Sequence, residues 1–202
     1  MNDKFYEDLL NIKTQGHKKW TNTINHPYEA TSYKALDMLI KEYPIDKSDS
    51  IVDFGCGKGR SLFFLNHFRG CRCVGIDFDA DLIDACEDNK LSYLKKGKSK
   101  SDAINFYSIK AQDYDVCDDD NKFYFFNPFS VKIFAKVIEN VLLSFENTLR
   151  DIDIILYYPS YDYIYFLENQ SPFILYKEIK LDNYDKDLSE RFLIYRLGIK
   201  NT

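Results

Sequence analysis

Short apolar runs that alternate with longer amphipathic segments, from Ser50 onward, are the feature that most constrains the fold. The runs are rich in β-branched and aromatic residues, as buried strands are, and the segments between them carry apolar residues at helical spacing. Alternation of this kind is typical of a mostly parallel sheet with helices packed on it. The expected strands are residues 50–55, 71–77, 103–110, 122–127 and 151–159, and the expected helices are residues 60–68, 79–94, 130–149 and 161–168.

The last part of the chain contains two further β-rich runs, residues 172–181 and 191–198, separated by the polar segment DNYDKDLSE. Since no helix lies between them, they are expected to pair as an antiparallel hairpin at the edge of the sheet. The sequence therefore predicts an α/β protein, a doubly wound three-layer sandwich. Its seven-stranded sheet is expected to be mostly parallel and to end in a C-terminal antiparallel hairpin.

The first 49 residues follow a different pattern. Apolar residues between Phe5 and Ile12 fall on one helical face, and residues 28–43 predict a second helix that Pro44 ends. A chain of 202 residues is long enough to bury a full core as a single domain. We interpret residues 1–49 as a helical cap or lid region and residues 50–202 as the main domain, the two forming one compact domain overall.

The motif with the most chemical information is VDFGCGKGR, between the first expected strand and the helix that follows it. Gly55, Gly57 and Gly59 alternate along it, and glycines here let the backbone approach a ligand at a helix amino terminus. A P-loop requires Ser or Thr after its lysine, and Lys58 is followed by glycine. A nicotinamide fingerprint requires G-x-G-x-x-G, and the third glycine comes one residue early. A P-loop is therefore excluded, and a nicotinamide oxidoreductase is disfavoured.

Two acidic residues sharpen the interpretation of this loop. Asp53 precedes the first glycine, where a carboxylate repels a pyrophosphate but attracts the ammonium group of an amino acid. Asp77 ends the second expected strand, where a carboxylate can accept hydrogen bonds from both ribose hydroxyls. Together they suit a nucleoside that carries an amino acid, as S-adenosylmethionine does.

With these motifs in this order, the chain resembles the class I S-adenosylmethionine-dependent methyltransferases from Ser50 to its C-terminus. VDFGCGKGR is similar to their motif I, and VGIDFD is similar to their acidic motif on the second strand. The resemblance implies a Rossmann-like fold, S-adenosyl-L-methionine as cofactor and S-adenosyl-L-homocysteine as product.

The resemblance also implies which residues contact the cofactor. An acid after the third strand approaches the adenine in this family, and Asp113 has that position; the alternative is that Asp113 and Asp115 are solvated loop acids. The segment before the main domain often folds over the cofactor in related enzymes. The cofactor-binding residues implied are Tyr28, Thr31, Asp53, Gly55, Cys56, Gly57, Gly59, Asp77, Phe78, Asp113, Tyr114 and Asn127.

The segment FYFFNPFS ends the fourth expected strand, where this family places residues that face the transferred methyl group. Some amino-methylating members carry [DN]-P-P-[YFW], whose Asn or Asp aligns the attacking nitrogen. Asn127, Pro128 and Phe129 match this motif in part, because the second proline is absent. The resemblance implies that these three are catalytic and that Phe129 packs on a substrate. The alternative is that Asn127 and Pro128 only turn the chain out of the sheet.

Methyl transfer is an in-line displacement that requires alignment and a deprotonated acceptor more than a dedicated base. His26 is a candidate base, with a structural or solvated histidine as the alternative, and Tyr157 and Tyr158 are expected at the same rim. We predict a methyltransferase that N-methylates a small molecule or a protein side chain. The alternatives are an RNA or DNA methyltransferase of the same fold and a non-catalytic subunit that binds S-adenosylmethionine.

Charge and cysteine content bear on partners and location. A net charge of −5 disfavours nucleic acid as a partner and favours cationic acceptors such as amines. We expect no membrane partner and a cytoplasmic location, because no run is long and apolar enough to span a bilayer and the N-terminus does not resemble a signal peptide. An odd number of cysteines, five, favours reduced structural thiols, and no metal site is expected.

Overall fold

The structure of the protein, a computed structural model, describes residues 3–16, 29–97 and 103–198. Seven strands form one sheet in the order β3-β2-β1-β4-β5-β7-β6. The first five strands of that order are parallel, and β7 pairs antiparallel with both β5 and β6. The strands are β1 Ser50–Phe54, β2 Arg72–Asp77, β3 Ile104–Ser108, β4 Lys122–Phe125, β5 Ile152–Tyr157, β6 Ile174–Lys180 and β7 Arg191–Leu197.

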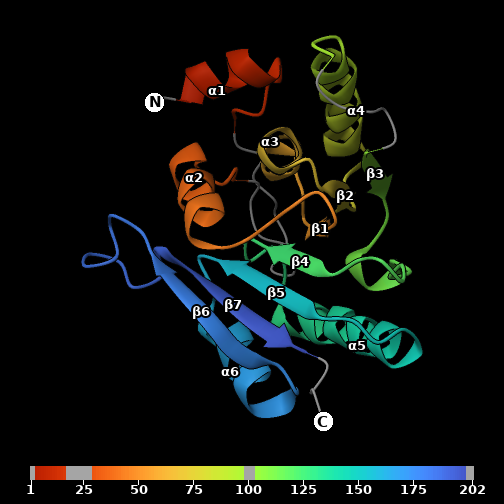
Figure 1. Ribbon diagram of the computed structural model, residues 1–202, viewed down its shortest axis with the longest axis vertical. Helices are drawn as coiled ribbons and strands as arrows, with labels where there is room; N and C mark the ends of the chain where they lie inside the picture. Colours follow the sequence, from red (N-terminus) through yellow and green to blue (C-terminus); the bar gives the residue numbers. More distant parts are fainter. Residues whose placement is uncertain (1–2, 17–28, 98–102, 199–202) are drawn as a thin grey trace.

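Helices cover both faces of this sheet (Figure 1). On one face α1, α2, α3 and α4 pack into one buried cluster, and on the other α5 and α6 pack into a second. The predicted doubly wound α/β sandwich with its C-terminal hairpin is confirmed. The helices are α1 Asp3–Leu10, α2 Tyr33–Glu42, α3 Arg60–Arg69, α4 Ala80–Leu94, α5 Val131–Asn147 and α6 Tyr161–Gln170, and a 3₁₀ turn, η1, spans Ala111–Asp113.

Side chains on alternate sides of β4 show how the two clusters are divided. Phe123 and Phe125 point into the cluster under α5 and α6, whereas Tyr124 points into the cluster under α1 to α4. This alternation follows from the two-residue period of a strand. Since parallel strands end at the same edge of the sheet, the residues after β1, β2, β4 and β5 are brought together there.

Several predicted elements differ by a few residues from the structure, and for two of them the structure shows the reason. The helix expected from residue 28 begins at Tyr33, because the side chain of Ser32 caps it by accepting a hydrogen bond from the Ala35 backbone N–H (3.2 Å). The strand expected to reach Asn127 ends at Phe125, because Asn127 adopts a left-handed backbone (φ 44°) that no strand can contain.

The N-terminal helices belong to the core of the domain. Tyr6 of α1 stacks on Tyr33 of α2, with ring centroids 4.6 Å apart, and both contact Phe64 of α3. These aromatic contacts are buried, so α1 and α2 form part of the layer on the α3 face. None of the described helices is long and apolar enough to cross a membrane.

Candidate active site

The glycine loop leaves β1 at the carboxyl edge of the sheet. The backbone N–H groups of Gly55 and Cys56 both donate to the carbonyl of Ile76 on β2, at 2.8 and 3.1 Å. Gly59 then caps the amino end of α3 in a left-handed conformation (φ 79°). The loop is thereby fixed against the end of β2, with the first turn of α3 directed at the site.

Gly55 shows why this loop requires glycine. Its φ is 80°, and a Cβ added to it would lie 2.4 Å from the Cβ of Pro128. The turn after β4 therefore packs directly on the backbone of the glycine loop, and any side chain at residue 55 would push Pro128 away. This contact brings two of the predicted motifs, VDFGCGKGR and FFNPF, to the same place.

Asp53 and Asp77 lie beneath this loop as two buried carboxylates. Asp77 accepts hydrogen bonds from the backbone N–H groups of Gly57 (3.1 Å) and Asp79 (3.0 Å), and Asp53 accepts one from the hydroxyl of Ser61 on α3. Burial raises the pKa of Asp53 to about 7, with the charge of Asp77 adding to the rise and the Ser61 hydrogen bond opposing it. Burial also raises the pKa of Asp77, against the backbone hydrogen bonds that lower it. Such a pair is favourable next to a cationic ligand.

A small hollow lies beside Asp53. Thr31, from the segment before α2, lies in its wall and shares a hydrogen bond with the hydroxyl of Tyr124 (2.8 Å). The hollow is lined by Glu29, Ala30, Thr31, Asp53, Gly55, Cys56, Arg60, Ser61, Tyr124 and Phe126. The structure therefore places Thr31, Asp53, Gly55 and Cys56 of the predicted set around one space.

Arg60 holds the N-terminal region against this hollow. It is the first residue of α3 and is only 5% exposed. Its guanidinium forms ion pairs with Asp3 (3.1 Å) and Glu7 (3.4 Å) of α1, donates to the hydroxyl of Thr14 (2.7 Å) and lies over the ring of Tyr33. It also donates to the Thr31 carbonyl (3.4 Å). One buried cation thus ties α1 and the Thr31 segment to the glycine loop.

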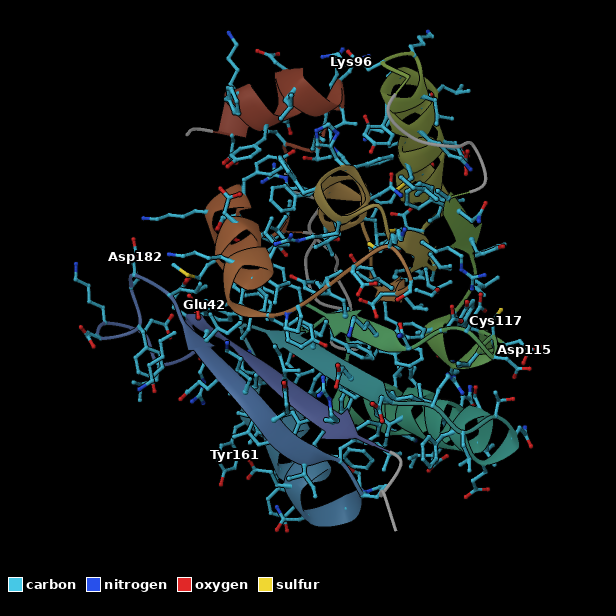
Figure 2. The ribbon with its side chains drawn as sticks, in the orientation of Figure 1. Glu42, Lys96, Asp115, Cys117, Tyr161 and Asp182 are labelled. Carbon is cyan, nitrogen blue, oxygen red and sulfur yellow. The ribbon has the colours of Figure 1, made fainter. Side chains whose placement is uncertain are left out.

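A second cavity, with a volume of about 270 Å³, adjoins the first. It shares Glu29, Ala30 and Phe126 with the small hollow and extends between α2 and the β6–β7 loop. Figure 2 shows Asp182, on that loop, at the side of the molecule where β6 meets α2. The other lining residues are Ser32, Lys34, Ala35, Met38, Tyr157, Leu181, Asp182, Asn183 and Glu190. We call this space the acceptor cavity.

Some predicted site residues lie elsewhere. Phe129 is 6% exposed and packs edge-on against Phe125 in the cluster under α5, so its side chain faces the core and not the acceptor cavity. The side chain of Tyr114 is also buried there, and its hydroxyl donates to Asp120 (2.8 Å). Asp113 ends η1 with an exposed side chain, and Phe78 is 43% exposed beyond Asp77. Tyr28 and His26 lie outside the described residues.

Several residues of the site were not predicted from the sequence. Among them, Phe126 and Glu29 line both spaces, Glu190 lines the acceptor cavity, and Arg60 lines the hollow. Phe126 follows Tyr124 by two positions, so the period of β4 already assigned it to the site face. The contacts of Glu190 and Arg60 depend on folding of distant segments, which no local pattern reports.

The cysteines of the described ranges are all unbonded. The sulfur atoms of Cys71 and Cys73 lie 3.8 Å apart, and burial raises the pKa of Cys73 and of Cys56 well above the usual value. Such protonated, buried thiols fit the structural role predicted for them.

Residues 36–147, more than half of the chain, match the family model described as methionine biosynthesis protein MetW. The chain belongs to the MetW family. The matched range runs from α2 to the end of α5, so it contains the glycine loop, Asp77 and Asn127. Glu29, Tyr157 and Glu190 of the acceptor cavity lie outside it. No curated protein sequence matches the chain.

Solved structures share the fold of this MetW-family chain at low identity. An RNA methyltransferase from Salinibacter ruber, in complex with S-adenosyl-L-homocysteine, is 16% identical, with a TM-score of 0.58 over 86% of this chain and 95% of that one. An S-adenosylmethionine-dependent methyltransferase from Aquifex aeolicus is 9% identical, with a TM-score of 0.57 over 80% and 87%. A chain from the complex of the Haloferax volcanii Trm112 methyltransferase activator with a methyltransferase is 11% identical, with a TM-score of 0.59 over 84% and 91%.

Family and fold agree with the motifs. The predicted membership in the class I S-adenosylmethionine-dependent methyltransferases is confirmed, and with it the Rossmann-like fold. The Salinibacter ruber structure contains S-adenosyl-L-homocysteine, the product that corresponds to the predicted cofactor.

Proposed function

We propose that the protein transfers a methyl group from S-adenosyl-L-methionine to a nitrogen atom of a small molecule or a protein side chain. The observation that carries this proposal is that the two spaces are neighbours: the hollow beside Asp53 and the acceptor cavity share Glu29, Ala30 and Phe126 in their walls. A donor site next to a cavity of about 270 Å³ is the arrangement that a two-substrate transfer requires.

The residues around the glycine loop fit the proposed donor. Within residues 3–16, 29–97 and 103–198, no basic side chain donates a hydrogen bond to the carboxylates of Asp53 and Asp77. The loop above them leaves no room for a side chain at residue 55. Asp53 would hold the amino-acid ammonium group and Asp77 the ribose hydroxyls. Gly55, Cys56, Gly57 and Gly59 would line the same ligand, and Thr31 would close it from the N-terminal segment. Phe78 and Asp113 follow their strands at the same edge and are proposed contacts of the adenine.

When bound, the donor supplies an electrophilic methyl group on a sulfonium, and a nitrogen lone pair displaces it, which leaves S-adenosyl-L-homocysteine and releases one proton from the nitrogen. The chain's own part is alignment. Asn127 follows β4 beside Pro128, which is fixed on Gly55, so its amide is the group proposed to orient the nitrogen. The left-handed backbone of Asn127 is one that asparagine adopts more readily than most residues. Phe129 has no proposed contact with substrate, since its side chain is in the core.

A nucleic acid is the second candidate acceptor, because an RNA methyltransferase and an rRNA methylase are among the proteins of similar fold. The negative charge at the rim of the acceptor cavity disfavours a nucleic acid. Glu29, Asp182 and Glu190 contribute three carboxylates there and Lys34 a single cation. Such a rim repels a phosphate backbone.

Methyl-labelled S-adenosylmethionine tests the proposal. The protein is incubated with a host lysate separated into protein, nucleic acid and small-molecule fractions, with Asp77→Ala as the inactive control. Label in the protein or small-molecule fraction that is lost in the control supports N-methylation of that class, and hydrolysis followed by chromatography identifies the methylated nitrogen. Label in the nucleic acid fraction alone, or tight binding of S-adenosyl-L-homocysteine with no label in any fraction, would overturn it.

A further inference from the structure

We infer that the acceptor cavity recognises a cationic head group, an alkylammonium, held between the Glu29 and Glu190 carboxylates and the aromatic wall of Phe126 and Tyr157. This inference rests on the proposed function, because it names the class of acceptor for the same site. The bound ammonium releases one proton before transfer, because only the neutral amine has the lone pair that attacks the methyl group, and the methylated product is again an ammonium.

The two carboxylates line the cavity without a basic partner. Within the described part of the chain, no lysine or arginine forms an ion pair with Glu29 or Glu190. The two cations nearest to them in sequence or in the cavity wall are already engaged. Lys34 pairs with Asp182, and Arg191 pairs with Glu178 at 2.7 Å. The cavity therefore has an excess of negative charge that nothing from the described chain neutralises.

The carboxylates also repel one another. Partial burial raises the pKa of Glu190, and the charges of Asp187 and Glu29 raise it further. The pKa of Tyr157 is raised by burial first and then by the charges of Glu190 and Glu29, which places its hydroxyl in the same negative field. A bound cation would relieve this repulsion, whereas a neutral acceptor would not.

The aromatic side of the cavity suits the same ligand. Phe126, at the end of β4, lies 4.5 Å from Tyr157, measured between ring centroids, and 6.3 Å from Tyr158. The hydroxyl of Tyr158 donates to Asp187, which fixes the β6–β7 loop that carries Glu190. Aromatic faces beside carboxylates bind ammonium groups through cation–π attraction and charge together. Phe126 also borders the hollow over Asp53, so a head group on this wall lies next to the donor side.

The source of the ammonium is a small amine or a lysine side chain, which share this chemistry. The experiment measures binding of n-butylammonium and of its neutral analogue 1-butanol to the protein saturated with S-adenosyl-L-homocysteine, by ligand-observed NMR. We expect n-butylammonium to bind about tenfold more tightly than 1-butanol, since a partly buried charge pair with cation–π contact is worth that factor. Nα-acetyl-lysine methylamide is tested alongside. Comparable binding of this analogue supports ammonium recognition with a peptide as the source, and binding of n-butylammonium alone supports it with a small amine as the source.

The double variant Glu29→Gln/Glu190→Gln identifies the groups responsible. It is expected to reduce the preference for n-butylammonium over 1-butanol to within about twofold. The control Asp185→Asn removes an exposed acid of the β6–β7 loop outside the cavity wall, and it should leave this preference unchanged. Affinity for S-adenosyl-L-homocysteine, measured by calorimetry, should be the same in the wild type and in Asp185→Asn. Because Glu29 also borders the hollow beside Asp53, the double variant is tested at a concentration of S-adenosyl-L-homocysteine that saturates it. Equal binding of the two probes, or a preference that survives in the double variant, would overturn the inference alone; failure of the wild-type protein to bind S-adenosyl-L-homocysteine would overturn the proposed function.

Discussion

At the scale of single residues, Asp53 is a buried carboxyl group that the sequence predicts to bind the ammonium group of the methyl donor. It is 4% exposed, its hydrogen bond comes from the neutral Ser61 hydroxyl, and burial raises its pKa to about 7. A group with a raised pKa is protonated in the free protein below that pH. A cationic amino-acid group binds to the ionised form, so the affinity for S-adenosyl-L-homocysteine should fall as the pH decreases through 7.

We expect the dissociation constant of S-adenosyl-L-homocysteine to increase roughly 20-fold between pH 7.5 and pH 5.5, because the ionised fraction of a group with this pKa decreases by about that factor. Isothermal titration calorimetry at several pH values measures it. The Asp53→Asn variant should bind weakly, with a nearly flat pH profile. An equally steep profile in that variant would assign the dependence to another group.

Gly55 permits a second test at the same scale, with Gly97 as a matched control. Both have left-handed backbones, φ 80° and 69°, but an added Cβ meets Pro128 at residue 55 and nothing within 4 Å at residue 97. Gly97→Ala should cost about 1 kcal/mol of unfolding free energy through backbone strain and leave ligand affinity unchanged. Gly55→Ala should cost more and weaken S-adenosyl-L-homocysteine binding by a factor of about ten or more, because the Asn127–Pro128 turn is displaced. Urea unfolding and calorimetry measure both, and similar losses in the two variants would contradict the role given to the Pro128 contact.

Residues of the glycine loop could be placed from the sequence because their order along two adjacent strands fixes their position. The positions of Phe129 and Tyr114 could not be predicted in this way. Each residue lies beyond the end of an element, where the two-residue period of a strand no longer determines the direction of the side chain. The left-handed backbone of Asn127 ends the strand, and the chain then turns into α5. The structure therefore places Phe126 in the site and Phe129 in the core.

At the scale of elements, α1 is held to the domain by few but specific contacts. Arg60 pairs with Asp3 and Glu7 of α1, and Lys96, at the end of α4, donates to the carbonyls of Asp8 and Leu9 (Figure 2). Sequence periodicity predicted a helix here, but not this attachment. The partners lie more than 50 residues apart in the chain.

Arg60→Met should loosen α1 and the Thr31 segment together. Removal of the cation leaves Asp3 and Glu7 without their partner and is expected to cost about 3 kcal/mol, so amide exchange in residues 3–10 should accelerate by about 100-fold while α5 is unaffected. Hydrogen exchange followed by mass spectrometry measures both helices. Lys4→Ala, an exposed change on α1, is the control and should leave exchange in α1 unchanged. Uniform acceleration in α1 and α5 would mean that Arg60 stabilises the whole domain and not the attachment of α1.

At the scale of the whole molecule, the two edges of the sheet have different roles. The carboxyl edge carries the site, including the carboxylates of Glu29 and Glu190. Near the opposite edge, charges are paired: Asp153 accepts two hydrogen bonds from Arg196 of β7 (2.7 and 2.8 Å), pairs with Lys122 of β4 (3.2 Å) and accepts the hydroxyl of Tyr43. These contacts join the C-cap residue of α2 to three strands. Alternation of apolar runs predicted the strands, whereas a charged network between them has no signature in the sequence.

This network should determine how the protein responds to acid. Burial alone would raise the pKa of Asp153, but the hydrogen bonds from Arg196 and Tyr43 and the charge of Lys122 hold it below its usual value. A depressed pKa in the folded state contributes stability above the unfolded value of about 4, and that contribution is lost as the pH falls through the folded value. Asp153→Asn should therefore lower the unfolding free energy at pH 7 by about 3 kcal/mol, and the difference from the wild type should shrink towards pH 3. Urea unfolding at pH 7, 5, 4 and 3 measures this difference in unfolding free energy, with Asp185→Asn as the exposed control. A difference that stays constant over this range would show that the ionisation of Asp153 does not stabilise the fold.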